Sequence, residues 1–187
     1  MSWMKERFGP GSIDPIAKFA ENDWMLIVKL HAMIETGLNG VLISHFGEPE
    51  LGRVIAKLDT SNSAGKVAFA KALQIITHNS AVLIQKLSEI RNFCVHDIKN
   101  FDFNLENYIS GLEEGDRKKL RKLVDHEIKS GLDDLQWPGS ALTGAIVNIM
   151  IQLHFHEMKC QLRDMTAQKY KWDSEELALL RQSMSTE

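Results

Sequence analysis

The sequence predicts an all-α protein, an antiparallel helical bundle that fits one domain of 187 residues. Apolar residues recur every three or four positions across several long segments, which is typical of amphipathic helices. No segment shows the apolar–polar alternation of a half-buried strand. Short turn-forming stretches separate the helical segments, and long helices joined by short loops favour antiparallel packing.

The first predicted helix covers residues 24–46, with Asp23 placed to cap its start and Gly47 placed to end it. One face of this helix contains Ile27, Ile34, Leu38, Val41, Leu42 and His45 at helical spacing. Pro49 suits the first turn of a second helix over 50–58. A loop over 59–65 follows, rich in turn formers.

Four more helices are expected before residue 130. The first covers residues 66–76, and the second begins near Asn79 or Ser80 as cap and continues to about residue 96. This second helix has a single apolar stripe, formed by Leu83, Leu87, Ile90 and Cys94. A turn over 100–104 leads to a short helix over 105–112 and a charged helix over 116–129.

The C-terminal part begins after the most turn-prone tripeptide of the chain, Trp137-Pro138-Gly139. Ser140 is placed to cap a long helix that ends near Met165. Its apolar face consists of Leu142, Ala145, Ile149, Leu153 and His156. A separate last helix is expected over 174–182, because Asp173 and Glu176 have capping-box spacing. We therefore divide the chain into an N-terminal extension (1–23), a bundle (24–130) and C-terminal helices (138–187) that pack on the bundle or on a dimer partner.

Composition favours a cytoplasmic protein without a membrane-spanning segment. The formal charge of −3 gives no overall attraction to nucleic acid, so such a role would need a local basic patch. The two cysteines form no CxxC pair and suit a reducing compartment. The N-terminus has no apolar signal region, and the apolar-rich stretch 141–155 is too short and too polar to span a bilayer.

The run Arg91–His96 (RNFCVH), at the end of an amphipathic helix, carries the main chemical signal. Asn92 and His96 are four residues apart and share a helix face. Arg91 and His96 are separated by about 140° around a straight helix. They converge only if the helix ends at His96 or the long arginine side chain swings around. Asp97, next in sequence, is placed to orient the imidazole.

This R-N-x-x-x-H pattern resembles the signature of the HEPN superfamily, whose RNA-cleaving members carry an arginine and a histidine a few residues apart. The segment 30–35 (LHAMIE) is similar to the family's first long helix, and 88–97 to its motif-bearing helix. The order and spacing also resemble the mannitol operon repressor family, a HEPN-like group of bacterial regulators. The resemblance covers about residues 24–110, whereas 138–187 have no such counterpart.

The resemblance implies a HEPN-type bundle with additional C-terminal helices that forms a homodimer. In RNA-cleaving members two such motifs meet across a dimer cleft and work without metal. Arg91, Asn92 and His96 would then be catalytic, with Glu35, His31 and Asp97 in supporting positions. The histidine would shuttle the proton of a ribose 2′-hydroxyl, and the arginine would hold the phosphate. Such an endoribonuclease would fit the toxin of a toxin–antitoxin pair.

Two other interpretations remain open. The first is a catalytically silent HEPN-like regulatory or interaction protein, for example a transcriptional regulator of the mannitol operon repressor type, with RNA or a regulatory protein as partner. Phe93, Cys94 and Val95 are compatible with it, since small residues are common at these positions in the family. The second is an unrelated helical protein, in which Asn92 and His96 cap a helix end and Arg91 pairs with Glu35.

Two further groups of residues are candidates for a binding site. The one basic cluster, on a predicted helix, is a solvated face or a phosphate-contacting patch for nucleic acid, and it consists of Arg117, Lys118, Lys119, Arg121 and Lys122. Near the C-terminus, His156 and Cys160 are four residues apart and could share a metal ion, but His154 lies about 200° away on the helical wheel. Glu157 adds no second ligand pair at the needed spacing, so we predict no metal and no cofactor.

Overall fold

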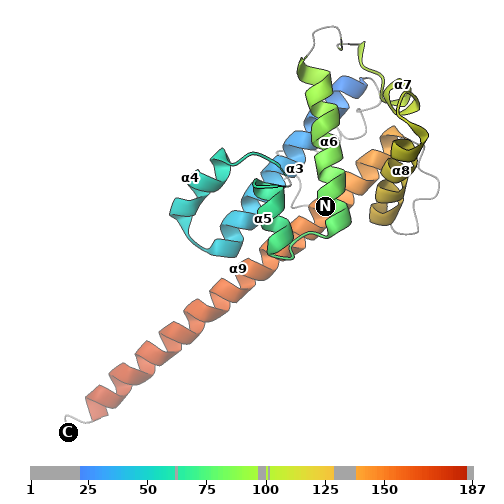
Figure 1. Cartoon of the computed structure of the whole chain (residues 1–187). Coiled ribbons are helices and arrows are strands. Elements are labelled where there is room, and N and C mark those ends of the chain that lie inside the picture. Colours follow the sequence, from blue (N-terminus) through green and yellow to red (C-terminus); the bar gives the residue numbers. More distant parts are fainter. Residues whose placement is uncertain (1–21, 62, 97–99, 101, 129–137, 185–187) are drawn as a thin grey trace.

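The computed structural model describes residues 22–61, 63–96, 100, 102–128 and 138–184. This described part consists of seven α-helices without a strand, packed as a bundle, which confirms the predicted all-α class (Figure 1). The predicted extension (1–23) lies almost wholly outside the described residues, as do Asp97 and Trp137. The helices are α3 (Asp23–Phe46), α4 (Pro49–Lys57), α5 (Lys66–Ala72), α6 (His78–His96), α7 (Leu105–Ser110), α8 (Glu114–Ile128) and α9 (Gly139–Met184).

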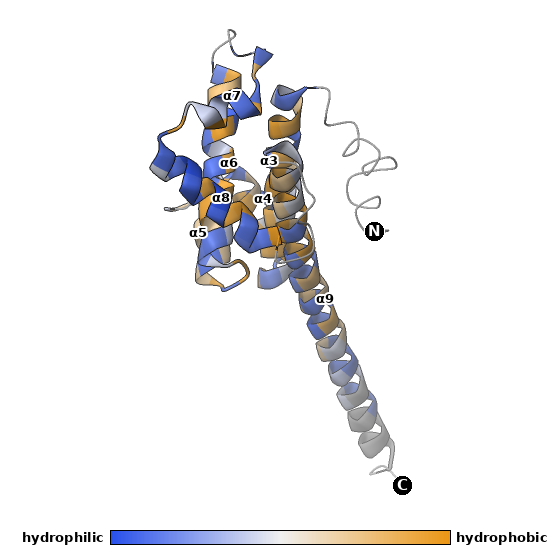
Figure 2. Cartoon of the chain, turned by 90° about the vertical axis from the view of Figure 1, so that its right-hand side faces the viewer, coloured by the Kyte–Doolittle hydropathy of each residue, from blue (hydrophilic) through white to orange (hydrophobic). Residues whose placement is uncertain are grey.

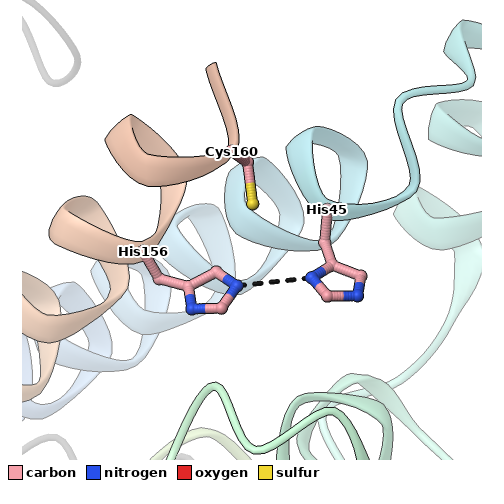
Figure 3. Close-up of side chains that lie close together, drawn as sticks. All are labelled: His45, His156 and Cys160. Atoms are coloured by element: carbon pink, nitrogen blue, oxygen red, sulfur yellow. Dashed lines mark hydrogen bonds between the residues drawn. The ribbon is translucent and has the colours of Figure 1, made fainter. Parts of the chain in front are cut away.

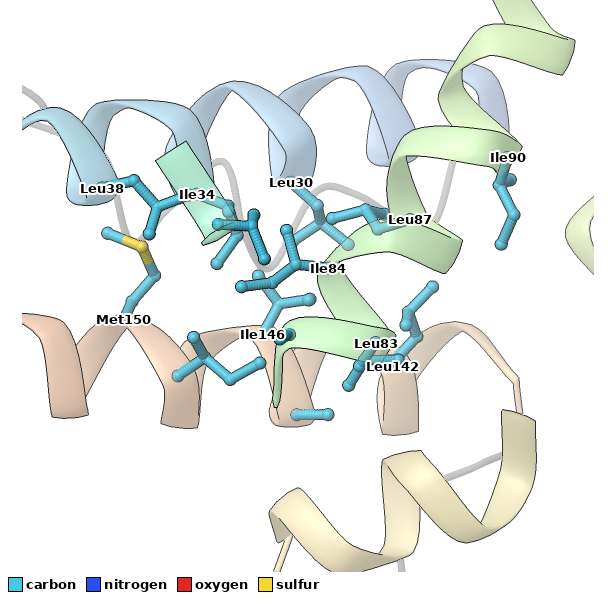
Figure 4. Close-up of a cluster of buried hydrophobic side chains, with 14 of the residues drawn as sticks. Leu30, Ile34, Leu38, Leu83, Ile84, Leu87, Ile90, Leu142, Ile146 and Met150 are labelled. Atoms are coloured by element: carbon cyan, nitrogen blue, oxygen red, sulfur yellow. The ribbon is translucent and has the colours of Figure 1, made fainter. Parts of the chain in front are cut away.

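The core lies where α3, α6 and the first part of α9 meet (Figure 4). Each helix supplies a buried apolar stripe, and burial of such a side chain stabilises the fold by about 1.5–3 kcal/mol relative to its exposure. The stripes include Leu30, Ile34 and Leu38 from α3, Leu83, Ile84 and Leu87 from α6, and Leu142, Ile146 and Met150 from α9. The first part of α9 therefore shares one core with α3 and α6.

The helices α3 and α9 pack closely at Gly37. A Cβ atom at this position would lie 2.9 Å from Cε of Met150 and 3.0 Å from Cδ1 of Leu153. Both distances are shorter than ordinary van der Waals contact, so a larger residue would require the Met150 and Leu153 side chains to shift.

The C-terminal region is one helix, not two. The expected end near Met165 and the separate helix over 174–182 are wrong, because α9 continues through 46 residues from Gly139 to Met184. The stretch between the two expected helices, 166–172, contains neither glycine nor proline. Without such a breaker, a capping-box spacing inside a helical sequence does not interrupt the helix.

Several predicted helix ends also need correction. Asn22, not Asp23, caps α3 by accepting a hydrogen bond from the Met25 N–H. Asp23 instead accepts from the Leu105 N–H at 2.8 Å and so caps α7 from across the fold. The start of α6 is capped by Thr77, whose hydroxyl accepts from the Ser80 N–H at 3.1 Å. Contacts between helices thus decide which side chain accepts a hydrogen bond from the free N–H groups at a helix start.

The predicted helix over 66–76 is shorter than expected. It ends at Ala72, and Gln74 has a positive φ of 56°, in the left-handed region. The chain turns there so that both Ile75 and Ile76 reach the core. Burial of two isoleucines outweighs the roughly 1–2 kcal/mol that a left-handed non-glycine residue costs.

A buried carboxylate fastens α8 to its neighbours. Oε1 of Glu127 accepts from the Ser80 hydroxyl at 2.7 Å, and Oε2 accepts from the Gln152 amide at 3.3 Å. The Asn148 amide donates to the backbone carbonyl of Glu127 at 2.7 Å. Both oxygens of the buried carboxylate therefore accept a hydrogen bond, as buried polar atoms generally do.

Helix α3 also has the length and apolar composition of a membrane-spanning helix. In the structure its apolar face contributes eight buried residues to the bundle. Length and composition alone do not separate such a core helix from a membrane span or a signal sequence.

Candidate functional site

A row of polar side chains follows the junction of α3 with α5 and α6. Nε2 of His31 lies 3.1 Å from the Ser88 hydroxyl. One turn further along α3, Glu35 accepts a hydrogen bond from Nζ of Lys66 at 3.0 Å. We call His31, Glu35, Lys66, Ser88 and Arg91 the polar seam.

Lys66 is fully buried, whereas the side chain of Glu35 is 42% exposed. The ammonium group has one further acceptor, the Ala56 carbonyl, at 3.5 Å. A buried ammonium is costly without a partner, so Glu35 holds the charge of Lys66 in place. In the structure Glu35 thus pairs with Lys66, and not with Arg91 as in the alternative interpretation of an unrelated helical protein.

His31 is a half-buried imidazole among charged groups. Burial lowers its pKa below the ordinary value of 6.5, and the positive charges of Arg91 and then Lys66 lower it further, while Glu35 raises it. The neutral form is therefore favoured near pH 7. His31 was predicted to support the motif, whereas the proton transfer was expected of His96.

The motif residues lie on the last turns of α6. Asn92 and His96 are exposed, Arg91 is half-buried, and Nη1 of Arg91 donates to Oδ1 of Asn92 at 3.1 Å. The described part of α6 extends to His96, and residues 97–99 lie outside the described residues. Beyond them, the side chain of Asn100 donates to the Phe93 carbonyl at 2.7 Å.

The basic cluster on α8 is exposed and largely balanced by acidic residues of the same helix. Lys118 pairs with Glu114, and Nζ of Lys119 lies 3.2 Å from Asp116. Arg121 lies 3.9 Å from Asp125, while Arg117 and Lys122 are also solvent-facing. Figure 2 shows hydrophilic residues over much of α8. Ion pairs within one exposed helix face are typical of a solvated surface and weaken the local positive field.

A second group of candidate site residues lies at the far end of α3 from the motif. His45 from α3 meets His156 and Cys160 from α9, and the three candidate ligand atoms lie within 4.8 Å of one another (Figure 3). Nδ1 of His45 is 3.3 Å from Nε2 of His156. Cys160 is buried and both histidines are half-buried. We call these residues the His–Cys triad.

The surroundings of the triad favour the neutral form of the His156 imidazole and the protonated form of the Cys160 thiol. Burial lowers the pKa of His156, and the charges of His45, Lys159 and Arg163 lower it further. Burial also raises the pKa of Cys160. Arg163 donates to the His45 carbonyl at 3.4 Å, which ties the end of α3 to α9 beside the triad.

Sequence reasoning found two members of this triad and missed the third. It placed His156 and Cys160 on a shared face but saw no further ligand nearby in sequence. His45, 111 residues before His156, had been assigned only to the apolar stripe of the first helix. A histidine on the core-facing stripe indicated a polar group close to another helix. Only the packing of α3 against α9 identified His156 and Cys160 as its neighbours. Lys66 was missed because a lysine at a helix start is usually exposed.

Comparisons with family models, curated proteins and solved structures found no match for this chain. The fold and the side-chain geometry therefore carry the functional argument.

Proposed function

We propose that the chain is a HEPN-like regulatory or interaction protein of the cytoplasm, of the mannitol operon repressor type, and that it acts as a homodimer. The outer half of α9 supports the homodimer, while the HEPN-like type rests on the resemblance of residues 91–96. From Gln161 to Glu176 the described side chains are exposed except for half-buried Asp164, and this part extends away from the other helices (Figures 1 and 2). A helix without tertiary contacts is marginally stable in water. The outer half of α9 therefore favours a binding partner.

Five of the exposed large apolar residues of α9 follow a seven-residue repeat, while exposed Tyr170 lies outside it. They are spaced alternately by three and four residues, with Lys169 at one position of the repeat, and their exposed fractions range from 42% to 77%. These residues, the outer stripe, are Phe155, Met158, Leu162, Met165 and Trp172. A narrow stripe at this spacing is the seam of a two-helix coiled coil.

The charges along the outer half favour a second copy of the same chain. Before Trp172 the segment from Phe155 onward has more basic than acidic residues, and after Trp172 three acidic residues follow. The basic residues are Lys159, Arg163, Lys169 and Lys171, against Glu157 and Asp164, and the acidic residues after Trp172 are Asp173, Glu175 and Glu176. An antiparallel pair of identical helices brings the basic part of one beside the acidic part of the other. A two-fold dimer of this kind is self-complementary.

Endoribonuclease activity is a second candidate, favoured by the accessibility of the motif. Asn92 and His96 are exposed and Arg91 is half-buried at the end of α6, and His31 of the polar seam lies within the electrostatic influence of Arg91. A phosphate could therefore reach the guanidinium and the imidazole.

RNA cleavage separates the two candidates. The wild-type protein and the His96→Ala variant are each incubated with labelled single-stranded RNA in EDTA, at high protein concentration. A regulatory protein leaves the RNA intact in both reactions. Cleavage by the wild type that leaves a cyclic phosphate end and is lost in His96→Ala would establish the nuclease instead, because a methyl group cannot exchange protons near pH 7.

Binding by the basic cluster is tested separately. The triple variant Arg117→Ala, Lys118→Ala and Arg121→Ala keeps the buried face of α8 intact. If the partner is nucleic acid held by this cluster, the variant loses salt-sensitive binding. Unchanged binding would point to a protein partner, as the paired charges of α8 suggest.

A further inference from the structure

We infer that His45, His156 and Cys160 form a binding site for a divalent transition metal, with Zn²⁺ as the best-matched ion. The inference does not depend on the proposed function, because the triad lies on α3 and α9, away from the motif at the end of α6. The ligands come from two helices that meet only in the folded chain (Figure 3).

The donor atoms have the chemistry and the spacing that zinc requires. Two imidazole nitrogens and a thiolate are standard ligands, at about 2.0–2.1 Å for nitrogen and about 2.3 Å for sulfur. At tetrahedral angles these bond lengths place two nitrogen ligands about 3.4 Å apart. The observed separation of Nδ1 of His45 and Nε2 of His156 is 3.3 Å. The two nitrogens are therefore already at the separation that a shared ion needs.

The thiol completes the site from the same side. Cys160 follows His156 by four residues on α9, so both face α3, and its Sγ lies within 4.8 Å of one ring nitrogen of each histidine. A nitrogen and a sulfur ligand of tetrahedral zinc are about 3.6 Å apart, so a small side-chain rotation closes the site. Three protein ligands leave a fourth coordination position for water, as in catalytic zinc sites.

A metal-free explanation accounts for only part of the triad. A hydrogen bond between the imidazoles satisfies one N–H group and one ring nitrogen, provided that the two rings have complementary tautomers. It gives no role to the buried thiol beside them. The other cysteine, Cys94, provides the contrast: it is equally buried, burial raises its pKa to about 11, and apolar residues of the core surround it. Cys94 is thus a matched control.

The position of the site gives the ion a structural consequence. His45 is the next-to-last residue of α3, and Cys160 is the last buried residue of α9 before the exposed part begins. An ion bound there would join the end of α3 to α9 where α9 leaves the bundle. Because the ion binds only the folded arrangement, it also stabilises the fold.

Cobalt(II) titration of the metal-free, reduced full-length protein tests the inference. We expect one Co²⁺ per chain, with the strong visible bands of four-coordinate cobalt and a thiolate-to-cobalt charge-transfer band. Cys160→Ser should remove the charge-transfer band. His45→Asn and His156→Asn should each weaken binding at least tenfold, and Cys94→Ser should bind as the wild type does.

Thermal unfolding with Zn²⁺ gives a second measurement. Zinc should raise the melting temperature of the wild type and of Cys94→Ser, but not that of His156→Asn, whose fold is checked by circular dichroism without metal. Absence of the cobalt bands in the wild type would overturn the site. So would cobalt binding that is unchanged in both histidine variants, or a charge-transfer band that depends on Cys94.

Discussion

The two halves of α9 belong to one unbroken helix but have opposite environments. The inner half, from Ala141 to Leu153, places its apolar residues in the core against α3 and α8. The outer half, from Gln161 to Glu176, continues the exposed apolar stripe that begins at Phe155 and Met158 within the same unbroken helix. Helical periodicity predicted a helix in both halves. It did not indicate which other helix packs against the apolar stripe of each half.

The width of the apolar stripe distinguishes the two halves. The inner stripe contains paired neighbours at every turn, namely Ala141 and Leu142, Ala145 and Ile146, and Ile149 and Met150. A stripe of this width suits a helix that contacts two others, as the inner half does. The outer stripe has single residues spaced by three and four, and this narrow seam suits one partner helix.

Truncation of one core residue should have the largest effect on stability. Ile149 is fully buried, so Ile149→Ala should lower the free energy of unfolding by about 2–5 kcal/mol. Leu162→Ala, a comparable truncation on the outer half, should change it by less than about 0.5 kcal/mol at concentrations where the protein is monomeric. Urea unfolding monitored by circular dichroism measures both. Equal losses would mean that the outer half is covered within the monomer.

Charges on the outer stripe should have the next largest effect, on assembly. The double variant Leu162→Glu and Met165→Glu should raise the dimer dissociation constant at least about 100-fold, because it places carboxylates in an apolar seam. The matched control, Ala167→Glu and Ser174→Glu, adds the same charge on the exposed opposite side of α9 and should leave the dimer intact. Light scattering over a concentration series provides the measurement. A monomeric wild type at micromolar concentration would contradict the dimer.

The smallest expected effect is a pH dependence of the free energy of unfolding, caused by His31 in the bundle. The pKa of His31 is lowered from 6.5 by burial and by Arg91, so the unfolded chain binds this proton more readily than the folded one. The contribution of neutral His31 to stability is complete above pH 6.5 and is lost as the pH falls below that value. We expect the free energy of unfolding to decrease from pH 7 to pH 5, and His31→Gln to flatten part of this decrease.

Dimerisation serves as the control for that titration, because His31 lies on α3, far along the fold from the outer stripe. The dimer dissociation constant should therefore respond to pH equally in the wild type and in His31→Gln. An unchanged slope of the unfolding free energy in His31→Gln would show that the imidazole is not held neutral in the folded state.

Local patterns predicted the helices better than their ends. The stripe of Leu83, Leu87, Ile90 and Cys94 is buried as expected, since apolar spacing reports the core-facing side of a helix directly. Helix ends depended on distant partners: Asp23 caps α7 instead of its own helix because Leu105 lies beside it in the fold. The continuous α9 was missed because a capping pattern has meaning only where the helix is already interrupted.

The candidate sites divide in the same way. Arg91, Asn92 and His96 were found because their spacing lies within one helix, where neighbours three or four residues apart share a face. The sequence by itself thus determined the all-α class, the buried stripes and the composition of the motif. Only the tertiary structure brought Glu35 to Lys66 and His45 to His156 and Cys160, because contacts between residues far apart in the chain depend on how whole helices pack. The same packing covered the inner half of α9 and left the outer half exposed.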